Sequence, residues 1–412
     1  MKFLCELIAA VVLSSHVFTL TAFASDNSCR KNMTESIFRY PTTGNVSTNG
    51  FPEYLAQNLS TPRANIKLFA EELKQAFNLK NISLVNSGSS ANLVAAAIAK
   101  EKMGKGHAIA AGFTFPTSIS ALTANGFEVS LADVEEGGFN ISPKAILKAI
   151  RPDTKVLMVT HFLGFPAFLK EIRQIADQYN LFLIQDACES MNMSIDGVPI
   201  IEFGDVVTWS FYHPHHLSSY GGGAVITSSL EDFKLAESLT HWGRACSCQV
   251  DPCDCQAPPG LNHNFWYERE GFNVAISELN AAFGRFKLTD FDKIEQARKR
   301  NYTYYFEFLK EIDNIIIYPM PSVGVSPFVF PITLKSQDLK RVEAELATKG
   351  IEIRSLMGGS IANHPGFKNL PNDGLNQTNA IGARSFFVGI HQDIPFNDIK
   401  EVARILKEVF NK

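Results

Sequence analysis

The sequence predicts an α/β protein built on a large, mainly parallel sheet with helices on both faces. From about residue 64, short apolar runs alternate with longer segments of helical periodicity. The apolar runs are continuous, which is typical of strands that are buried on both faces. With 412 residues and 45% hydrophobic composition, the chain is long enough for one large domain and a smaller one.

The expected elements follow in the order of such a fold. Amphipathic periodicity predicts a helix over 66–77, and Gly88-Ser89-Ser90 opens a second helix after the apolar strand 82–86. Further strands are expected at 107–112, 128–134, 155–161, 181–186, 206–211 and 224–227. Two long helices, near 277–288 and from 292, lead into alternating strands and helices that end in the helix 398–410. We therefore expect a large domain over 37–290 and a small C-terminal α+β domain over 291–412.

The net charge and the N-terminal segment limit which partners and which cellular location are expected. The net charge is −4 and no basic run occurs, so the sequence gives no support for nucleic-acid binding. Residues 1–28 resemble a secretory signal, with an apolar run that ends in Ala22-Phe23-Ala24. Glu6 at the start of that run and a single lysine before it argue against export. Export and membrane tethering stay open as alternatives to the cytoplasm.

A histidine stands where a catalytic lysine is expected. Residues 210–216, Ser-Phe-Tyr-His-Pro-His-His, followed by Gly221-Gly222-Gly223, have the frame of the cofactor lysine loop of a vitamin B6 enzyme. In that frame a lysine lies five residues after Ser210, but this chain has His215 there and no lysine between Lys170 and Lys234. Imidazole cannot form the stable covalent link that an amine forms with an aldehyde, but it transfers protons near neutral pH.

Three other segments, together with Ser210, could hold a phosphorylated aromatic cofactor. Gly88 and Ser89 begin a helix whose free amides suit an anion, and Ser210 adds a hydroxyl. Asp186 ends a buried strand, where a carboxylate can pair with a protonated pyridine nitrogen. Phe115 follows another strand and could stack on a ring. Each has a structural alternative: a glycine/serine cap, an N-cap aspartate and a core phenylalanine.

The cysteines point to a metal centre. Four of the seven, Cys246, Cys248, Cys253 and Cys255, lie within ten residues, and Cys188 comes two residues after Asp186. This arrangement favours iron–sulfur or zinc over a disulfide framework; a cysteine-rich loop that binds nothing is the alternative. The three histidines of the 213–216 segment are too close together to favour a tetrahedral zinc site.

Taken together, these segments resemble the DegT/DnrJ/StrS-type sugar aminotransferase family, which has the aspartate aminotransferase fold (type I). The resemblance runs from about residue 37 to the C-terminus and is closest to the lysine-lacking branch, the CDP-4-keto-6-deoxyglucose 3-dehydrases (CDP-6-deoxy-L-threo-D-glycero-4-hexulose-3-dehydrases). It is carried, in order, by residues 86–93, 110–117, 186–188, 210–216, 242–248 and 271–273.

The resemblance implies a role for each matching residue. His215 replaces the lysine and acts as the proton-transfer group, while Asp186 binds the pyridine nitrogen. Phe115 stacks on the ring, and Gly88, Ser89 and Ser210 bind the cofactor phosphate. Asn273 reaches the phosphate of a partner subunit, so a homodimer is expected.

The resemblance also implies a 2Fe–2S cluster. The family pattern places 57 residues between the first two cysteines, and Cys188 and Cys246 match this spacing. Cys248 then follows after one residue, as in the pattern. The fourth ligand departs from it, because neither Cys253 nor Cys255 follows after seven residues; we expect Cys255. A second departure is Tyr220-Gly221-Gly222-Gly223, which replaces Gly-Glu-Gly-Gly.

The implied activity is C3 dehydration and deoxygenation of a nucleotide-linked 4-keto-6-deoxyhexose. Pyridoxamine phosphate and the cluster would be the cofactors, and a flavin/iron–sulfur reductase would supply electrons. The product class would be 3,6-dideoxyhexoses for lipopolysaccharide O-antigen, made from cytoplasmic nucleotide sugars. The alternatives are a cluster-free pyridoxamine phosphate-dependent GDP-4-keto-6-deoxymannose 3-dehydratase, a catalytically silent sensor that binds cofactor or sugar nucleotide, and an exported zinc-binding protein.

Overall fold

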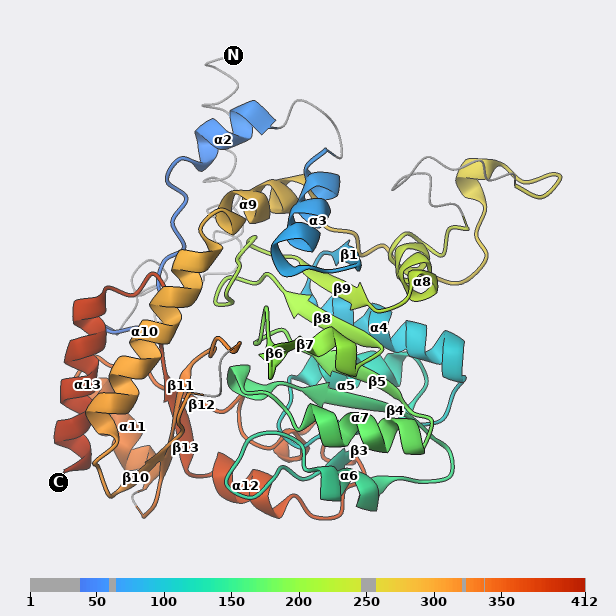
Figure 1. The fold of residues 1–412 in the computed structure, drawn as a ribbon. Helices are drawn as coiled ribbons and strands as arrows, with labels where there is room; N and C mark the ends of the chain where they lie inside the picture. Colours follow the sequence, from blue (N-terminus) through green and yellow to red (C-terminus); the bar gives the residue numbers. More distant parts are fainter. Residues whose placement is uncertain (1–37, 59–63, 246–256, 321–323, 337, 412) are drawn as a thin grey trace, which may run out of the picture.

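The computed structural model describes residues 38–58, 64–245, 257–320, 324–336 and 338–411. Its centre is a seven-stranded sheet in the order β1-β9-β8-β5-β4-β2-β3 (Figure 1). The strands are β1 (Asn81–Val85), β2 (His107–Ala111), β3 (Glu128–Ala132), β4 (Thr154–Thr160), β5 (Phe182–Asp186), β8 (Val206–Ser210) and β9 (Gly223–Thr227). β9 runs in the direction opposite to the other six strands, so the mainly parallel sheet and the α/β fold class are confirmed.

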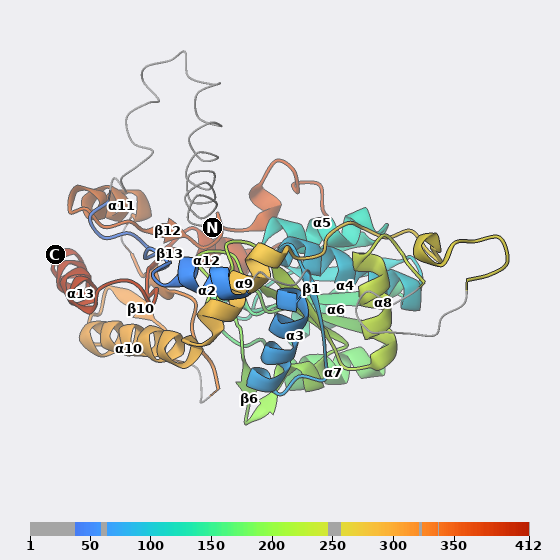
Figure 2. The same cartoon turned by 90° about the horizontal axis from the view of Figure 1, so that it is seen from above.

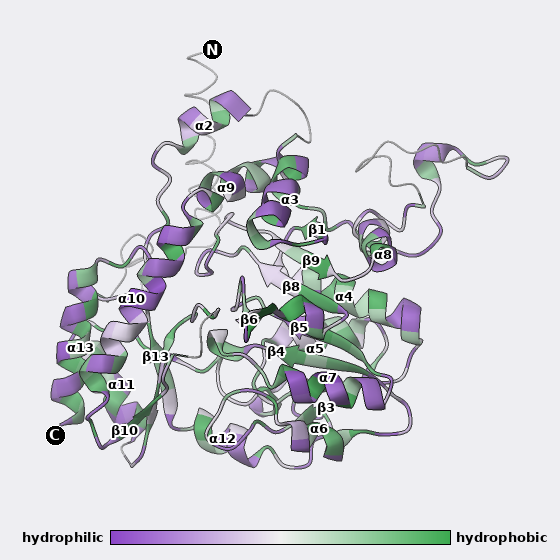
Figure 3. Cartoon of the chain, in the orientation of Figure 1, coloured by the Kyte–Doolittle hydropathy of each residue, from purple (hydrophilic) through white to green (hydrophobic). Residues whose placement is uncertain are grey.

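Both faces of this sheet are covered by helices, as Figures 1 and 2 show. One face packs against α3 (Ala64–Phe77), α6 (Pro143–Ala149), α7 (Leu169–Gln178) and α9 (Glu278–Leu288). The other face packs against α4 (Gly88–Met103), α5 (Pro116–Ala124) and α8 (Leu230–Thr240). Within β2, Ile109 belongs to the first core and Ala110 to the second. Because both faces of the sheet are buried, its strands appear in the sequence as continuous apolar runs. Figure 3 shows these strands as largely hydrophobic.

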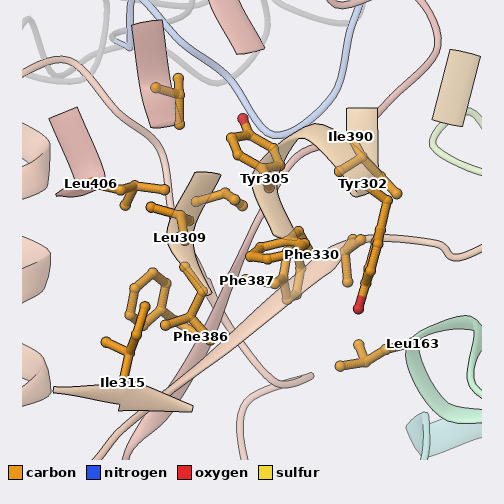
Figure 4. Close-up of a cluster of buried hydrophobic side chains, with 14 of the residues drawn as sticks. Leu163, Tyr302, Tyr305, Leu309, Ile315, Phe330, Phe386, Phe387, Ile390 and Leu406 are labelled. Atoms are coloured by element: carbon orange, nitrogen blue, oxygen red, sulfur yellow. The ribbon is translucent and has the colours of Figure 1, made fainter. Parts of the chain in front are cut away.

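A second, antiparallel sheet follows α10 (Phe291–Leu309) in the order β10-β11-β13-β12. Its strands are β10 (Ile315–Ile317), β11 (Phe330–Leu334), β12 (Arg354–Ser355) and β13 (Ser385–Val388). Helices α11 (Leu339–Thr348), α12 (Asn376–Gly382) and α13 (Phe396–Phe410) complete this unit. Tyr302, Tyr305 and Phe330 gather in its core, and Leu163 from the central sheet's loops joins them (Figure 4). The two parts of the fold therefore share apolar contacts.

Two smaller elements lie beside these sheets. The hairpin β6 (Ser194–Ile195) and β7 (Val198–Pro199) follows β5, and α2 (Phe51–Asn58) packs its Phe51 ring edge-on against Phe283. The segment before α2 runs along the second unit, where Tyr40 pairs with Ile351 in a parallel bridge. No helix in the described ranges combines the length and the apolar composition needed to cross a bilayer. The signal-like residues 1–28 lie outside those ranges.

Candidate active site

A cavity of about 690 Å³ opens between the carboxyl ends of the central strands and the second unit. Seven of the residues that the sequence singled out line it, although they come from four separate segments. These are Gly88, Ser89, Phe115, Asp186, Cys188, Ser210 and His215. Strand ends at a sheet of this type are the usual ligand position, which is why residues so distant in sequence meet there.

The start of α4 forms an anion cradle. Ser87 caps the helix by accepting the N–H of Ser90 at 3.0 Å, and helix geometry leaves the N–H groups of Gly88 and Ser89 without an intrahelical acceptor. A Cβ atom on Gly88 would lie 2.7 Å from the Ser210 side chain and 2.8 Å from the Cys188 sulfur. Glycine is therefore required here for close packing. The resulting cradle of amides and hydroxyls suits a phosphate.

Asp186 is fixed at the bottom of the cavity by neutral donors. Its Oδ2 accepts hydrogen bonds from Asn92 Nδ2 at 2.8 Å and from Ser118 Oγ at 2.6 Å. The Asn92 amide is oriented in turn by Thr208 Oγ1, which donates to Asn92 Oδ1 at 2.7 Å. In the described part of the chain Asp186 has no ion-pair partner. The carboxylate is therefore available to pair with a cation brought by a ligand.

His215 lies in a half-buried position on the wall of the same cavity. Burial lowers its pKa to about 4, and the nearby Arg298 guanidinium contributes to this shift. The ring is therefore neutral at pH 7. Its Nδ1 atom is buried without a hydrogen-bond partner among the described residues. A neutral imidazole with an unpaired ring nitrogen can exchange a proton with a ligand in the cavity.

Phe115 and Ser89 come from neighbouring helix starts. Phe115 precedes Pro116 at the start of α5 and is 53% exposed although it is apolar. Ser89 Oγ donates to Thr117 Oγ1 at 2.9 Å, which joins the starts of α4 and α5. An exposed ring on a cavity wall is available for stacking, so the core alternative for Phe115 is wrong.

Cys188 belongs to the wall of this cavity. Burial raises the pKa of its thiol well above the usual range, and the Asp186 carboxylate adds to this effect. Cys246, Cys248, Cys253 and Cys255 lie outside the described residues, so the structure does not place the rest of the expected ligand set. Within the described residues, no group of three or more His, Cys, Asp or Glu side chains is arranged to hold a metal.

Asn273 lies apart from the cavity of its own chain. Its backbone pairs with His241 in an antiparallel bridge, and its side chain is exposed. Its expected contact with a partner's phosphate stays a prediction.

The glycine-rich segment after the histidines keeps an unusual backbone. Gly221 and Gly222 have φ values of 139° and 127°, and Tyr220 has φ 54° in the left-handed region. Tyr220 occupies a position where the family pattern has glycine. Because the left-handed region disfavours residues with a side chain, contacts of the tyrosine ring must stabilise this conformation. The ring packs against Phe283 at 4.7 Å between ring centroids and lies parallel to the His213 ring.

Sequence reasoning gave no role to several residues of the site. Glu189 follows Cys188 directly, lines the cavity, and has a pKa raised to about 8 by burial. Arg298 and Phe328 reach the cavity from the second unit. Asn92 could have been found, because it is a polar residue within the otherwise apolar face of a helix, one turn after Gly88. The sequence holds no comparable signal for Arg298 or Phe328.

Comparisons with known proteins agree with this geometry. Residues 46–407 match the DegT/DnrJ/EryC1/StrS aminotransferase family. The chain belongs to this family. It is 33% identical to the dTDP-4-dehydro-2,6-dideoxy-D-glucose 3-dehydratase of Saccharopolyspora spinosa, over 84% of this chain and 80% of that protein. It is 32% identical to the lipopolysaccharide biosynthesis protein RfbH of Salmonella typhimurium, over 85% and 86% of the two chains.

The fold is also that of solved members of the family. The E. coli GDP-4-keto-6-deoxy-D-mannose-3-dehydratase with bound hydrated PLP superimposes with a TM-score of 0.81 over 90% of this chain and 99% of that one. The sequence identity in this alignment is 22%, so it supports the fold alone. The aspartate aminotransferase-like fold predicted from the motifs is thereby confirmed, and so is the family.

Proposed function

We propose that this protein is a pyridoxamine phosphate-dependent 3-dehydratase of nucleotide-linked 4-keto-6-deoxyhexoses. The observation that carries the proposal is His215, a neutral imidazole at the position of the family's lysine, beside a phosphate cradle and a deep carboxylate. The dehydratases among its relatives support the same reaction class.

The residues of the cavity fit this cofactor. The cradle at Gly88, Ser89 and Ser210 would hold its phosphate, and Asp186 would hold the proton on its ring nitrogen. The exposed face of Phe115 would cover the ring. Bound there, the cofactor would supply an amine for the keto group of the sugar and a ring that accepts electrons. Because the described part of the cavity contains no lysine, nothing there displaces the amine form.

His215 performs the proton transfer in this proposal. Its ring is neutral at pH 7, so one of its two nitrogens can accept a proton from carbon and then return it to the departing C3 hydroxyl. Asp186, held by Asn92 and Ser118, keeps its geometry while the charge above it changes. Such fixed donors and acceptors reduce the reorganisation that accompanies the reaction.

The reaction can be completed in two ways, which differ in whether the protein needs an iron–sulfur cluster. The cluster-free completion, in which ammonia is released by hydrolysis, is supported by relatives called GDP-4-keto-6-deoxy-D-mannose 3-dehydratase. The reductive completion, with a 2Fe–2S cluster on Cys188, Cys246, Cys248 and Cys255 and a flavin/iron–sulfur reductase, is favoured by the cysteine spacing. We propose the cluster-free completion as the first candidate.

The test begins with anaerobic purification, iron and sulfide analysis, and an absorption spectrum. The protein is then loaded with pyridoxamine phosphate and assayed with CDP-, dTDP- and GDP-linked 4-keto-6-deoxyhexoses and with an amino acid as amine donor, which restores the amine form of the cofactor after each release of ammonia. Ammonia and the 3-deoxy product are the readouts. Loss of the C3 oxygen without iron supports the first candidate. About two irons per chain, with turnover that requires a reductase, supports the second. Cofactor binding without turnover supports the silent sensor and contradicts both.

We also propose that the protein acts as a homodimer. The region 257–270 projects from the central sheet (Figure 1) and carries the exposed apolar residues Leu261, Phe265 and Tyr267. Exposed apolar residues grouped on one segment are typical of an interface. In such a dimer Asn273, which follows this region, would serve the partner's cradle.

A further inference from the structure

Arg298 is a buried cation with an unusual set of partners. It lies on α10 with no exposed surface, and in the described part of the chain it makes no ion pair with a carboxylate. Its Nη2 donates to the Pro214 carbonyl at 2.7 Å, its Nη1 to the Phe328 carbonyl at 2.9 Å, and its Nε to Gln392 Oε1 at 2.7 Å. Burying a guanidinium on neutral acceptors costs free energy that the fold must offset elsewhere.

These acceptors surround the histidine loop, residues 212–216. Pro214 precedes His215 directly, and the Phe328 ring stacks on the His215 ring at 5.0 Å with an angle of 22° between the planes. The Phe328 ring also lies beneath the Arg298 guanidinium, 5.8 Å from its central carbon. One cation thus contacts both the backbone before His215 and the ring that packs on its imidazole.

Further hydrogen bonds connect the segment 326–328 to the loops of the central sheet and to His216. The Phe328 N–H donates to the Leu163 carbonyl at 3.1 Å, and the Leu163 N–H donates to Glu189 Oε2 at 2.6 Å. His216 Nε2 donates to the Ser326 carbonyl at 3.0 Å. The segment 326–328 is therefore fixed to the central sheet, and Arg298 fixes the histidine loop to that segment.

We propose that Arg298 is a positioning residue, which sets the orientation of the His215 imidazole through the Pro214 carbonyl and the Phe328 ring. The inference rests on the proposed role of His215 in proton transfer. A planar guanidinium can donate in three directions at fixed angles, whereas a lysine ammonium on a flexible stem cannot reproduce that geometry. Reacting groups lose rate steeply when they are displaced by a fraction of an ångström to an ångström.

The kinetic test compares Arg298→Lys and Arg298→Met with Arg300→Lys and Arg300→Met. Arg300 lies on the same helix but is exposed, so it controls for loss of charge from α10. The Arg298 variants should lower kcat on the order of 10- to 100-fold and leave KM nearly unchanged. The Arg300 variants should behave as wild type. Wild-type kcat in Arg298→Lys, or equal losses from the Arg300 pair, would overturn the proposal.

Folding is checked by thermal unfolding and by binding of pyridoxamine phosphate. If the Arg298 variants do not fold, Phe328→Leu takes their place, because it removes the ring contact and leaves the buried cation hydrogen-bonded. A kcat unchanged in folded Phe328→Leu then contradicts the proposal, and a selective fall in kcat supports it.

A crystal structure of Arg298→Met separates this proposal from the proposed function. We expect the Pro214 carbonyl and the His215 ring to be displaced. An undisplaced loop overturns the positioning role whatever the activity. If wild-type protein shows no turnover with any sugar nucleotide, the dehydratase assignment fails, while the displacement still decides the role of Arg298.

Discussion

At the scale of single residues, the site is defined by the imidazole at position 215. The sequence predicted both the loss of the lysine and the residues that meet around it, because strand ends and a glycine-rich helix start are local patterns. The residues that contact them from distant parts of the chain could not be predicted from the sequence. Arg298 is 83 residues from His215, and only the packing of α10 against the histidine loop brings the two together.

Replacing His215 tests its role directly. His215→Asn should lower the rate of C3 dehydration by about 100-fold or more, because the proton-transfer group is lost. His215→Lys should reduce dehydration and favour amino transfer, because an amine can bind the aldehyde form of the cofactor covalently. Product analysis by mass spectrometry with each variant measures both outcomes. Retained dehydration in His215→Lys would refute the assignment, and His213→Asn serves as the neighbouring control.

At the scale of elements, the cradle depends on close approach between the start of α4 and the strands β8 and β9. A Cβ atom on Gly223 would lie 2.6 Å from the Ser87 backbone, just as one on Gly88 would meet Ser210. The strand and helix positions were predicted to within a few residues, since their apolar runs are strong. The reversed direction of β9 was not predicted, because strand direction depends on long-range pairing that periodicity does not encode.

Gly88→Ala should weaken cofactor binding about tenfold and cost about 1–3 kcal/mol of unfolding free energy, because the added methyl group overpacks the cradle. Gly366→Ala is the matched control, since a Cβ atom there has no neighbour within 4 Å. Fluorescence titration with pyridoxamine phosphate and urea unfolding measure the two effects. Equal behaviour of the two variants would contradict the packing argument.

At the scale of the whole molecule, buried titratable groups couple stability to pH. His161 accepts the Ala167 N–H at Nδ1 and pairs with Gln185 at Nε2, so it is held neutral inside the fold. Burial lowers its pKa to about 4. Below pH 6.5 the unfolded chain binds a proton that the folded chain excludes, so stability falls as the pH decreases from 6.5 toward 4.

The size of this effect can be measured with His161→Gln. At pH 5 the histidine alone should account for about 2 kcal/mol of lost unfolding free energy. Urea unfolding between pH 4 and 6.5 should therefore show a shallower pH dependence in the variant than in wild type. Identical slopes would show that His161 does not titrate in this window.

The projecting region 257–270 offers a test of assembly. Phe265→Asp places a charge on an exposed apolar residue and should shift the protein from dimer to monomer in light scattering. Cofactor affinity should fall with it, because Asn273 would no longer reach a partner. Leu147→Asp, at an exposed apolar position on α6, should leave the mass unchanged. A monomeric wild type would refute the dimer.

The segment 40–42 affects the order in which the parts of the chain fold. Tyr40 donates its N–H to the Gly350 carbonyl, and Thr42 donates to Glu352, a partner 310 residues later in the chain. Thr42 also lines the cavity. During synthesis Thr42 leaves the ribosome before its partner Glu352, so it has no place to dock until 310 further residues have followed it. Closing so long a loop is slow, and the cavity should therefore reach its final shape only at the end of folding.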